Sequence, residues 1–481
     1  MHSIDETLEW EDLYKTVELD DEGVFDMICN KETEAVFQIE SDLFKGIISD
    51  MQPTSMDDIV VLTSIGRPGP LQAGMHTKYN NRKNGLEETV MPVHDTEDIV
   101  GDTFGTIVYQ EQVMAIAKKI AGFDDNQADS YLRKALAKKK QAIMDLCKRW
   151  LIYGKKNEEA PKGYDNNNPN CTMYDPVGRY GAPILGASNN GYDIKDLEAF
   201  WADMEGYASY LFNKSHAACY SYITLLTAYL KKYHPVEFFA NVFSIQDDED
   251  KRAKYIKIAE KMGIEIKTPD INKSNRDFTP LLEEQTILYG LGSVKGVGDN
   301  AIDNIIANRP FTSLEDIVEK VPKRALNKRA GIALIKSGAL NDININRNEL
   351  INDFHTLRKD KDDLLEITDY NQNVCIEYEI ATLGAPITFK PWWDEVATDE
   401  KVEIVATVKK VRELVDRNGN MMAFIEVESD GCHISGVVFA RTYCAHADKF
   451  DMILGEPTLI LKGKKDGKGQ LIVSTVKNYV Q

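Results

Sequence analysis

The chain has 481 residues, which is too long for a single hydrophobic core, so three or four domains are expected. Its 43% hydrophobic and 28% charged residues are typical of a soluble globular protein, and it shows neither an amino-terminal signal pattern nor an apolar run of membrane-spanning length. The net charge of −20 excludes a protein that coats nucleic acid through its overall charge. We therefore expect a cytoplasmic protein without membrane contact, in which any nucleic-acid contact is local.

The first 160 residues carry helical periods interrupted by loops, in the segments GVFDMICNKETEAVFQIE, VYQEQVMAIAKKIAGF and QADSYLRKALAKKKQAIMDLCKRWLIYG. Residues 155–193 are rich in Asn, Gly and Pro and have no usable period, so they are expected to form a long loop or insertion. A helical pattern returns over 194–245 and ends near the acidic DDED at 247–250, where we place a domain boundary.

Short helices are expected from 251 to 345, and the charged stretch 346–372 is typical of a linker helix. Beyond it, five segments alternate apolar and polar residues and are rich in Val and Ile: KVEIVATVKKV, MMAFIEVES, CHISGVVFA, PTLILKGKK and QLIVSTVKNY. The first two are separated by DRNGN, a hairpin turn signal. The expected fold class is thus multidomain and mainly α, with a C-terminal β-barrel of the oligonucleotide-binding (OB) kind.

The seven cysteines are scattered and form no Cys-x-x-Cys pair, so they are expected to be reduced thiols that mostly pack in the interior. Cys432-His433 and Cys444-x-His446 are chemically able to bind a metal, but their spacing fits no standard zinc framework. We expect no metal site in this chain.

Positive charge is clustered in two islands. RKALAKKKQAIMDLCKR at 133–149 contains seven basic residues and one acidic residue, and KVPKRALNKR at 320–329 forms the second island. Such runs are usually solvated helix faces, but two of them in so acidic a chain favour local binding of anions.

The stretch FNKSHAACYSYITLLTAYLKKYHPVEFF at 212–239 places Lys214, Ser215 and His216 directly before an apolar and aromatic run. This pattern predicts a helix whose first free N–H groups, together with Lys214 and His216, bind a phosphate. The three residues alone leave open the alternative that His216 is a hydrogen-bonded core histidine.

Three other stretches supply groups that suit phosphate. RPGPLQAG at 67–74 is a rigid turn that presents Arg67, and YQEQVM at 109–114 opens a helix. LRKALAKKK at 132–140 puts Arg133 and Lys134 one helical turn before three lysines. None of these stretches contains an obvious nucleophile.

Five motifs in fixed order resemble the fingers domain of the bacterial DNA polymerase III α subunit, the C-family replicative polymerase: AVFQIES, RPGPLQAGM, YQEQVMAIAKKIAGF, ADSYLRKALAKKK and FNKSHAACYSYITLLTAYLKKYHPVEFF. The resemblance continues through PDINKS, YGLGSVKGVGDNAIDNII and LIKSGALND into the terminal barrel. It departs from the family pattern at Gly66, where a large residue is usual, and at Leu136-Ala137, where Met-Gly is usual.

The resemblance implies four regions: polymerase fingers at 1–246, a helix-hairpin-helix duplex-binding domain at 247–345, a linker at 346–395 and an OB-fold at 396–481. The residues that it implies for binding of the incoming dNTP are Arg67, Arg133, Lys134, Lys138, Lys139, Lys214, Ser215 and His216. The residues expected to contact DNA are Lys140, Lys295, Gly296, Gly298, Lys323, Arg324, Lys328 and Arg329. The two glycines would let the hairpin backbone approach a phosphate, whose charge is met by main-chain N–H groups without base readout.

Nucleotide transfer in the resembled family uses two Mg²⁺ ions held by aspartates of a palm domain that lies upstream of AVFQIES. The acidic stretches DDEGVFD (20–26), DDED (247–250) and KDKDDL (359–364) lie in charged or loop-like settings and do not replace these aspartates. We expect a split polymerase, inactive as this chain alone, in which a separate palm- and thumb-containing chain holds Mg²⁺ while this chain binds dNTP and primer–template DNA. The alternative is a non-catalytic DNA-binding or scaffold protein derived from a polymerase.

The barrel is expected to contact single-stranded template, although it offers few aromatic residues for stacking on bases, namely Phe424, Phe439, Tyr443 and Tyr479. The sliding-clamp peptide of the family has no clear counterpart, because 346–380 offers only DDLLEI, so binding of a clamp is left open. A divided replicase is more expected of viruses than of cells, and we expect a bacterial or phage-infected bacterial cell as the setting.

Overall fold

The computed structural model describes residues 15, 17–133, 141–155, 183–207, 211–359, 365, 372–389, 392–429, 432–452 and 455–479. The chain forms two compact units, Met1–Pro235 and Val236–Gln481. No helix within the described ranges is both long and apolar enough to cross a membrane.

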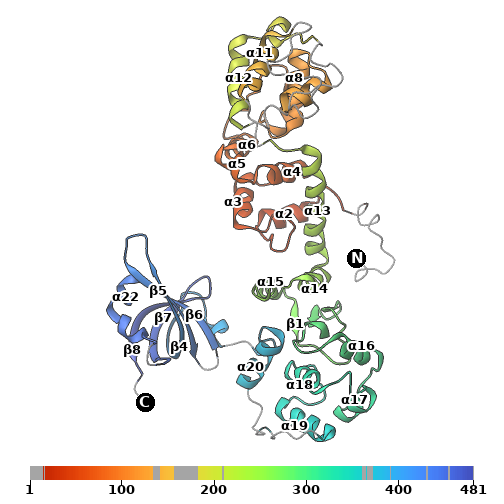
Figure 1. Cartoon of the computed structure of the whole chain (residues 1–481), viewed down its shortest axis with the longest axis vertical. Helices are drawn as coiled ribbons and strands as arrows, with labels where there is room; N and C mark the ends of the chain where they lie inside the picture. The colour runs from red at the N-terminus through yellow and green to blue at the C-terminus, as the bar shows by residue number, and fades with distance from the viewer. Residues whose placement is uncertain are drawn as a thin grey trace. The chain divides into compact units, whose positions relative to one another are not determined.

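The described elements of the first unit are all helical (Figure 1). They are α2 (Glu22–Cys29), α3 (Asp42–Met51), α4 (Met56–Ile65), α5 (Pro68–Gln72), α6 (Met75–Lys83), α7 (Glu97–Val100), η1 (Gly101–Thr103), α8 (Gln110–Ala121), α9 (Asp125–Gln127), the π-helical η2 (Ala128–Arg133), α11 (Gln141–Tyr153), η4 (Ala187–Asn190), α12 (Ile194–Tyr207) and α13 (Lys214–Tyr233).

Side-chain caps fix where several of these helices begin. Ser41, Ser55 and Asn213 each accept a hydrogen bond from the backbone N–H three residues later, which satisfies one of the free donors at the start of a helix. The predicted helix start before Lys214 is therefore confirmed. A glycine in the left-handed region, Gly122 with φ of 74°, ends α8.

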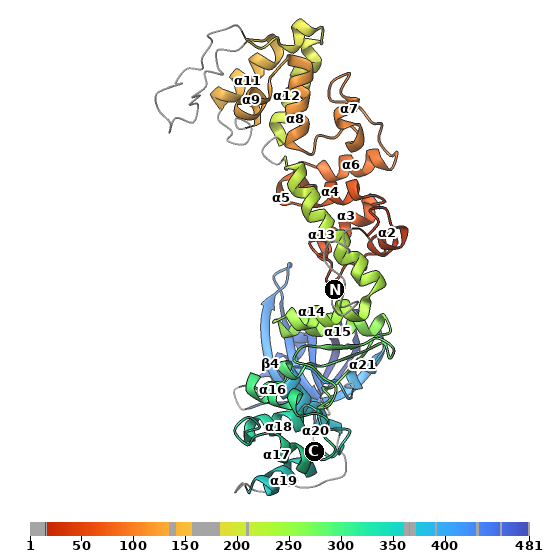
Figure 2. The ribbon, with the colours of Figure 1, turned by 90° about the vertical axis from the view of Figure 1, so that its right-hand side faces the viewer.

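Helix α13 packs along α2 and α4 (Figures 1 and 2). The hydroxyl oxygens of Thr63 and Ser221 lie 2.9 Å apart between α4 and α13, in a contact buried on both sides. The face of α13 toward α4 also buries Ala217 and Leu225 in one core cluster. Because this side of α13 is anchored, the opposite side and the first turn are left exposed to solvent.

Helices α8, α11 and α12 pack together in the first unit (Figure 2). Next to them, Lys155 and Ile184 pair through two backbone hydrogen bonds of 2.8 and 2.9 Å. The long loop or insertion expected over 155–193 includes 156–182, which lie outside the described residues, whereas its end forms η4.

The second unit combines short helices with two sheets. Its elements are α14 (Pro235–Ile245), α15 (Glu249–Lys261), β1 (Glu265–Lys267), β2 (Thr279–Leu281), β3 (Thr286–Leu288), η6 (Leu291–Ser293), α16 (Asp299–Ala307), α17 (Leu314–Lys320), α18 (Lys328–Lys336), α19 (Arg347–Arg358), α20 (Gln372–Leu383), α21 (Trp392–Glu395), β4 (Lys401–Val415), β5 (Met421–Ser429), β6 (Cys432–Val438), α22 (Ala440–His446), η7 (Ala447–Phe450), β7 (Thr458–Lys465) and β8 (Leu471–Asn478). Strand β3 lies between β1, which is parallel to it, and β2, which is antiparallel.

Helices α16 to α19 share one hydrophobic cluster that includes Ile302, Leu314, Leu334 and Phe354. Helices α19 and α20, in the region expected to be a linker, both pack against α18. Gly331 of α18 is needed for this packing, because a Cβ there would overlap the Phe354 ring of α19. This region is therefore built into the helical core of the second unit.

The predicted β-barrel is confirmed. Strands β4 to β8 close into a barrel of order β4-β5-β6-β8-β7, and each of the five sequence segments supplies one strand. The alternation in the sequence matches the burial, since Ala423, Ile425 and Val427 of β5 point inward while their neighbours do not. In the DRNGN turn, Asp416 accepts from the N–H groups of Asn418 and Asn420, which fixes the β4–β5 hairpin.

Candidate nucleotide and nucleic-acid interface

The first turn of α13 presents the three polar residues singled out in the sequence. Lys214, Ser215 and His216 are all exposed, and Asn213 caps the turn by accepting from the His216 N–H at 2.8 Å. The alternative of His216 as a buried core histidine is therefore not what the structure shows. An exposed helix start carrying a lysine and a histidine suits an anionic ligand.

A carboxylate of the protein already lies at this helix start. Glu111 accepts from the Lys214 N–H at 3.1 Å and from the Asn213 side-chain amide at 2.8 Å. It satisfies one of the free amides of α13, so a phosphate in this place must be bound chiefly by side chains. Glu111 belongs to the YQEQVM stretch, but this role of its carboxylate was not predicted.

Arg67 is brought to the same place by the Arg-Pro-Gly-Pro turn. It is the residue that precedes α5, with an extended backbone, and Pro68 starts the helix. Its guanidinium carbon lies 3.6 Å from the centroid of the Phe212 ring, close to the start of α13. Partial burial of the guanidinium lowers the pKa of Arg67 from its ordinary value.

Phe212 is held by backbone contacts to the YQEQVM segment. Its N–H donates to Val108 at 3.1 Å, and its carbonyl accepts from Gln110 at 2.9 Å. Tyr109 lies beside it, buried, with the Lys214 ammonium 5.4 Å from the centre of its ring. The YQEQVM stretch and the segment that leads into α13 are far apart in the sequence, and these backbone hydrogen bonds join them.

A row of aromatic rings continues from Phe212 along α13. The ring of His216 lies 5.4 Å from Phe212 and 4.5 Å from Tyr220, and Tyr220 stacks on Phe37 of the AVFQIES motif at 5.9 Å. His216 and Tyr220 are four residues apart, which places them on one face of α13, and Phe212 lies just before the helix begins. Sequence reasoning missed this row, although the spacing was visible.

The structure therefore gathers four of the five fingers motifs around the start of α13. We name this set of residues the α13 cluster: Phe37, Arg67, Tyr109, Glu111, Phe212, Lys214, Ser215, His216 and Tyr220.

The fifth motif is placed only in part. Arg133 ends the π-helical η2, where its Nε donates to Asp129 at 2.6 Å, so its ion pair within the described ranges is with Asp129 and not with a residue of the α13 cluster. Lys134, Lys138, Lys139 and Lys140 lie outside the described residues. The expected role of this motif in dNTP and DNA binding stays a prediction.

The VKGVG hairpin has the backbone that its glycines predict, but its lysine is already paired. Gly296 has a φ of 101°, which favours glycine, and Gly298 precedes the first turn of α16. The Lys295 ammonium donates to Glu249 of α15 at 2.7 Å. Arg276 pairs with Asp299 and Asp303 of α16, and these hydrogen bonds raise the pKa of Arg276.

The second basic island lies beside this hairpin. A Cβ on Gly296 would lie 3.3 Å from Nε of Arg329, so the hairpin packs directly on α18. Lys328 and Arg329 are exposed at the start of α18, and Arg324 is exposed in the preceding loop. Lys323 is exposed and donates to the Arg358 carbonyl at 3.3 Å.

The barrel places its aromatic residues unequally. Phe424, Phe439 and Tyr479 are exposed, whereas Tyr443 is buried and its hydroxyl donates to Glu413. Three rings therefore remain for stacking on bases, and Tyr443 belongs to the barrel core.

The described residues do not offer a magnesium site. Across the ranges that the structure describes, no group of three or more His, Cys, Asp and Glu side chains could hold a metal ion.

Two family models match the chain. Residues 4–159 match the bacterial DNA polymerase III alpha subunit finger domain, and residues 263–350 match a helix-hairpin-helix motif. The first match contains Arg67 and Glu111, and the second contains Gly296 and Arg329.

Curated relatives extend the similarity over most of the chain. DNA polymerase III subunit alpha of Aquifex aeolicus is 36% identical over 337 residues, which are 69% of this chain and 26% of that protein. The proteins of the same name from Campylobacter jejuni and Mycobacterium tuberculosis are 31% and 33% identical over 81% and 68% of this chain. The chain spans only 26% to 30% of the length of these relatives. It is thus related to one part of the bacterial DNA polymerase III alpha subunit, the part that contains the finger domain and a helix-hairpin-helix motif.

Proposed function

We propose that this chain is the fingers and DNA-binding part of a DNA polymerase III α-like enzyme, and that the α13 cluster binds the triphosphate of the incoming dNTP. The observation that carries this proposal is the contact of both Arg67 and His216 with Phe212. It gathers a guanidinium, an imidazole and the Lys214 ammonium at one exposed helix start.

The chemical role of these groups is electrostatic. Arg67 and Lys214 neutralise phosphate charge, and fixed positive groups stabilise the charge that develops on a leaving pyrophosphate. Glu111 orients the start of α13 through Lys214 and Asn213 and keeps part of the helix start negative. A triphosphate is therefore expected to bind to the side chains of the cluster, next to Arg67, and not to the backbone N–H groups on the axis of α13.

The enzyme is proposed to be completed by a palm and thumb on a separate chain. That chain would hold Mg²⁺, which supplies the activation of the primer hydroxyl and the shielding of the leaving group. This chain alone would then bind substrates without joining them. A sliding clamp is a further proposed partner, and its expected peptide region overlaps residues outside the described ranges.

The second unit is proposed to bind primer–template DNA. Gly296 of the hairpin packs against Arg329, and Lys328 and Arg329 are exposed at the start of α18, which suits a phosphate backbone without base readout. Lys295 contributes less than the sequence indicated, because its charge is compensated by Glu249. The exposed Phe424 and Phe439 of the barrel are proposed to contact single-stranded template.

Primer extension tests the division of the enzyme. The purified 481-residue chain, a palm- and thumb-containing chain of a relative, and their mixture are each assayed with Mg²⁺, dNTPs and a primed template. We expect synthesis in the mixture only, and at least tenfold less synthesis with Arg67→Gln or His216→Asn. Lys118→Gln is the matched control, because Lys118 is an exposed first-unit cation that pairs with Asp125.

Two results would contradict the proposal. Robust synthesis by this chain alone would refute the split enzyme. Binding of DNA that is indifferent to dNTP, together with no synthesis in the mixture, would favour the non-catalytic scaffold.

A further inference from the structure

A groove follows α18 in the second unit, and we name it the α18–α20 groove. Its volume is about 450 Å³, and the residues that line it are Lys328, Arg329, Ile332, Ala333, Lys336 and Thr382. Lys328, Ile332 and Lys336 are spaced four apart in α18, so they lie in one row on the helix. At 1.5 Å per residue, the two lysines are about 12 Å apart along the helix, with an aliphatic side chain between them.

The floor of the groove is apolar. Ala333 is buried, and Ile332 packs partly buried against the helical core. The Thr382 hydroxyl donates to the Tyr378 carbonyl at 2.7 Å, and the Thr382 carbonyl accepts from the Lys295 N–H at 2.8 Å. Because these polar groups are already hydrogen-bonded, Thr382 contributes mainly its methyl group to the groove. The groove therefore combines an apolar floor with cations at its two ends.

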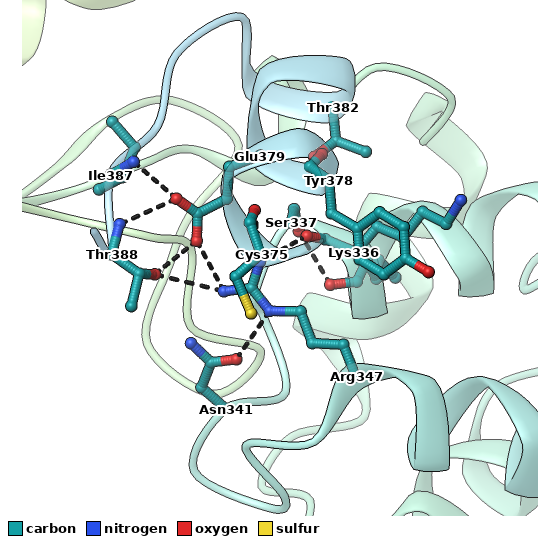
Figure 3. A network of polar contacts seen from close by, with 11 residues as sticks. Lys336, Ser337, Asn341, Arg347, Cys375, Tyr378, Glu379, Thr382, Ile387 and Thr388 are labelled. Carbon is teal, nitrogen blue, oxygen red and sulfur yellow. Dashed lines mark hydrogen bonds and ion pairs between the residues drawn. The ribbon is translucent and has the colours of Figure 1, made fainter. Parts of the chain in front are cut away.

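The cation at the far end of the groove is held in place by α19 and α20 (Figure 3). The Lys336 ammonium lies 4.4 Å from the ring centre of Tyr378, and the Tyr378 hydroxyl donates to Asn348 at 2.8 Å. Arg347 Nη1 donates to the Lys336 carbonyl at 2.8 Å. Because Lys336 is already positioned, less conformational entropy is lost when a ligand binds to it.

A buried ion pair fixes the wall that α20 supplies (Figure 3). Arg347 of α19 donates from Nη2 to Glu379 of α20 at 2.6 Å, and the two side chains are 2% and 0% exposed. Glu379 also accepts from the backbone N–H groups of Ile387 and Thr388, at 2.6 and 2.8 Å. The α18–α20 groove is therefore formed before any ligand arrives, as binding pockets usually are.

The lining indicates which kind of ligand fits. An apolar floor between two helices suits the apolar stripe of an amphipathic helix, and the cations at its ends complement carboxylates. Glutamates eight positions apart on such a helix are separated by about 12 Å, the same spacing as Lys328 and Lys336. A residue midway between them, four positions from each, lies on the same side of that helix.

We propose that the α18–α20 groove docks an amphipathic helix of a partner protein that carries a carboxylate, an aliphatic residue and a second carboxylate at positions i, i+4 and i+8. The aliphatic side chain lies on Ile332 and Ala333. One carboxylate pairs with Lys336, and the other pairs with Lys328 or Arg329. This protein-docking role goes beyond the proposed binding of nucleotide and DNA.

Binding of a designed peptide to the full chain tests the proposal. The probe is a fluorescein-labelled helical peptide with Glu, Leu and Glu at positions i, i+4 and i+8, and its anisotropy is measured at low salt. We expect Lys336→Glu and Ile332→Ser each to raise Kd at least tenfold relative to wild type, because the first loses an ion pair and the second an apolar contact. Replacing the Leu of the peptide by Ser should have the same effect without any change in the protein.

A charge swap tests the ion pair directly. Two further peptides carry Lys in place of either the first or the second Glu. Both should bind wild type more weakly than the parent peptide does. One of them should bind Lys336→Glu more tightly than the parent peptide does, because opposite charges then face each other again, and that peptide also reveals the direction of the docked helix.

The matched control is Lys477→Glu, which reverses an exposed cation on β8 of the barrel. It is expected to leave the Kd of every peptide unchanged. A loss of affinity in this control as large as that in Lys336→Glu would show that the peptide responds to overall charge, and the proposal would be wrong.

Three further results would overturn the proposal. The first is no saturable binding of the parent peptide to wild type, and the second is an equal Kd for the parent and both lysine-bearing peptides. The third is another occupant of the groove in the absence of peptide binding. That occupant would be duplex DNA if Ile332→Ser weakens duplex binding, or a second copy of this chain if sedimentation velocity shows self-association that Ile332→Ser abolishes.

Discussion

The guanidinium of Arg67 stacks on the ring of Phe212, with 3.6 Å between the guanidinium carbon and the ring centroid. This contact joins the Arg-Pro-Gly-Pro turn to the segment that leads into α13. Arg67, Lys214 and His216 are all exposed, and Phe212 immediately precedes the cap of the helix that carries Lys214 and His216. Phe212 thus contacts both Arg67 and His216.

We predict that Arg67 and Phe212 are energetically coupled in nucleotide binding. Phe212→Leu removes the ring beneath the guanidinium and should weaken dATP binding in wild type but have little further effect in Arg67→Gln. Cation–π contacts of this kind contribute about 0.5–2 kcal/mol, which sets the expected coupling energy. Titration of a fluorescent dATP analogue against the four proteins of this cycle measures it, and strictly additive losses would contradict the prediction.

We predict that the Phe44 ring leaves no room for a side chain at position 66. A Cβ at position 66 would overlap this ring, so Gly66→Ala is expected to destabilise the first unit by about 1–3 kcal/mol through overpacking. Gly46→Ala is the matched control, because nothing lies within 4 Å of a Cβ there, and in the helix α3 it should stabilise by about 0.5–1 kcal/mol. Urea denaturation of both variants checks the opposite signs, and equal midpoints would contradict them.

We predict a pH-dependent contribution of Lys231 to stability. Its side chain is 1% exposed and donates to the carbonyls of Glu32 and Glu34, and burial lowers the pKa of Lys231 to about 8. The unfolded chain, with the ordinary pKa of lysine, binds more protons between pH 8 and 10.5, so the free energy of unfolding rises with pH in that window.

Comparison with Lys231→Met isolates this effect. Wild type should gain about 2 kcal/mol of unfolding free energy relative to the variant between pH 7.5 and pH 9.5. Denaturation curves at a series of pH values measure the difference. A difference that stays constant over this range would show that the pKa of Lys231 is not lowered in the folded protein.

We predict that the two hairpin glycines have separable roles. Gly296→Ala introduces a side chain at a φ of 101° and against Arg329, so it should lower both thermal stability and duplex affinity. Gly298→Ala meets no atom within 4 Å and has a φ of −98°, so stability should change by less than about 0.5 kcal/mol while duplex affinity falls. Unchanged duplex affinity in Gly298→Ala would contradict a close approach of this backbone to phosphate.

Local patterns in the sequence were enough to predict much of the fold. The barrel strands were predicted from the alternation of apolar and polar residues, which arises because only one face of each strand is buried, as in β5. The start of α13 was predicted from the ability of Asn213 to cap a helix. The family resemblance supplied the order of the fingers motifs, and the match of residues 4–159 to the finger-domain family confirmed the resemblance itself.

Contacts between distant segments were not predictable in the same way. The carboxylate of Glu111 reaches the start of α13, and that of Glu249 reaches Lys295, through tertiary packing that no local period encodes. The Arg347–Glu379 pair lies in a stretch that was predicted to be a linker because charged residues such as Glu349 and Asp353 interrupt its apolar pattern, although six of the twelve residues of α19 are buried. Tyr443 could not be separated from the exposed aromatics of the barrel until its environment was known.

Photocrosslinking tests the central claim most directly, that the triphosphate lies at the α13 cluster. A dNTP analogue with a photoreactive group on its γ-phosphate is irradiated with the full chain, and the modified peptides are mapped by mass spectrometry. We predict adducts in peptides that contain Arg67, Tyr109 or Lys214, and their loss when unlabelled dNTP competes. Adducts confined to the second unit, or adducts in these peptides that unlabelled dNTP does not remove, would contradict the account.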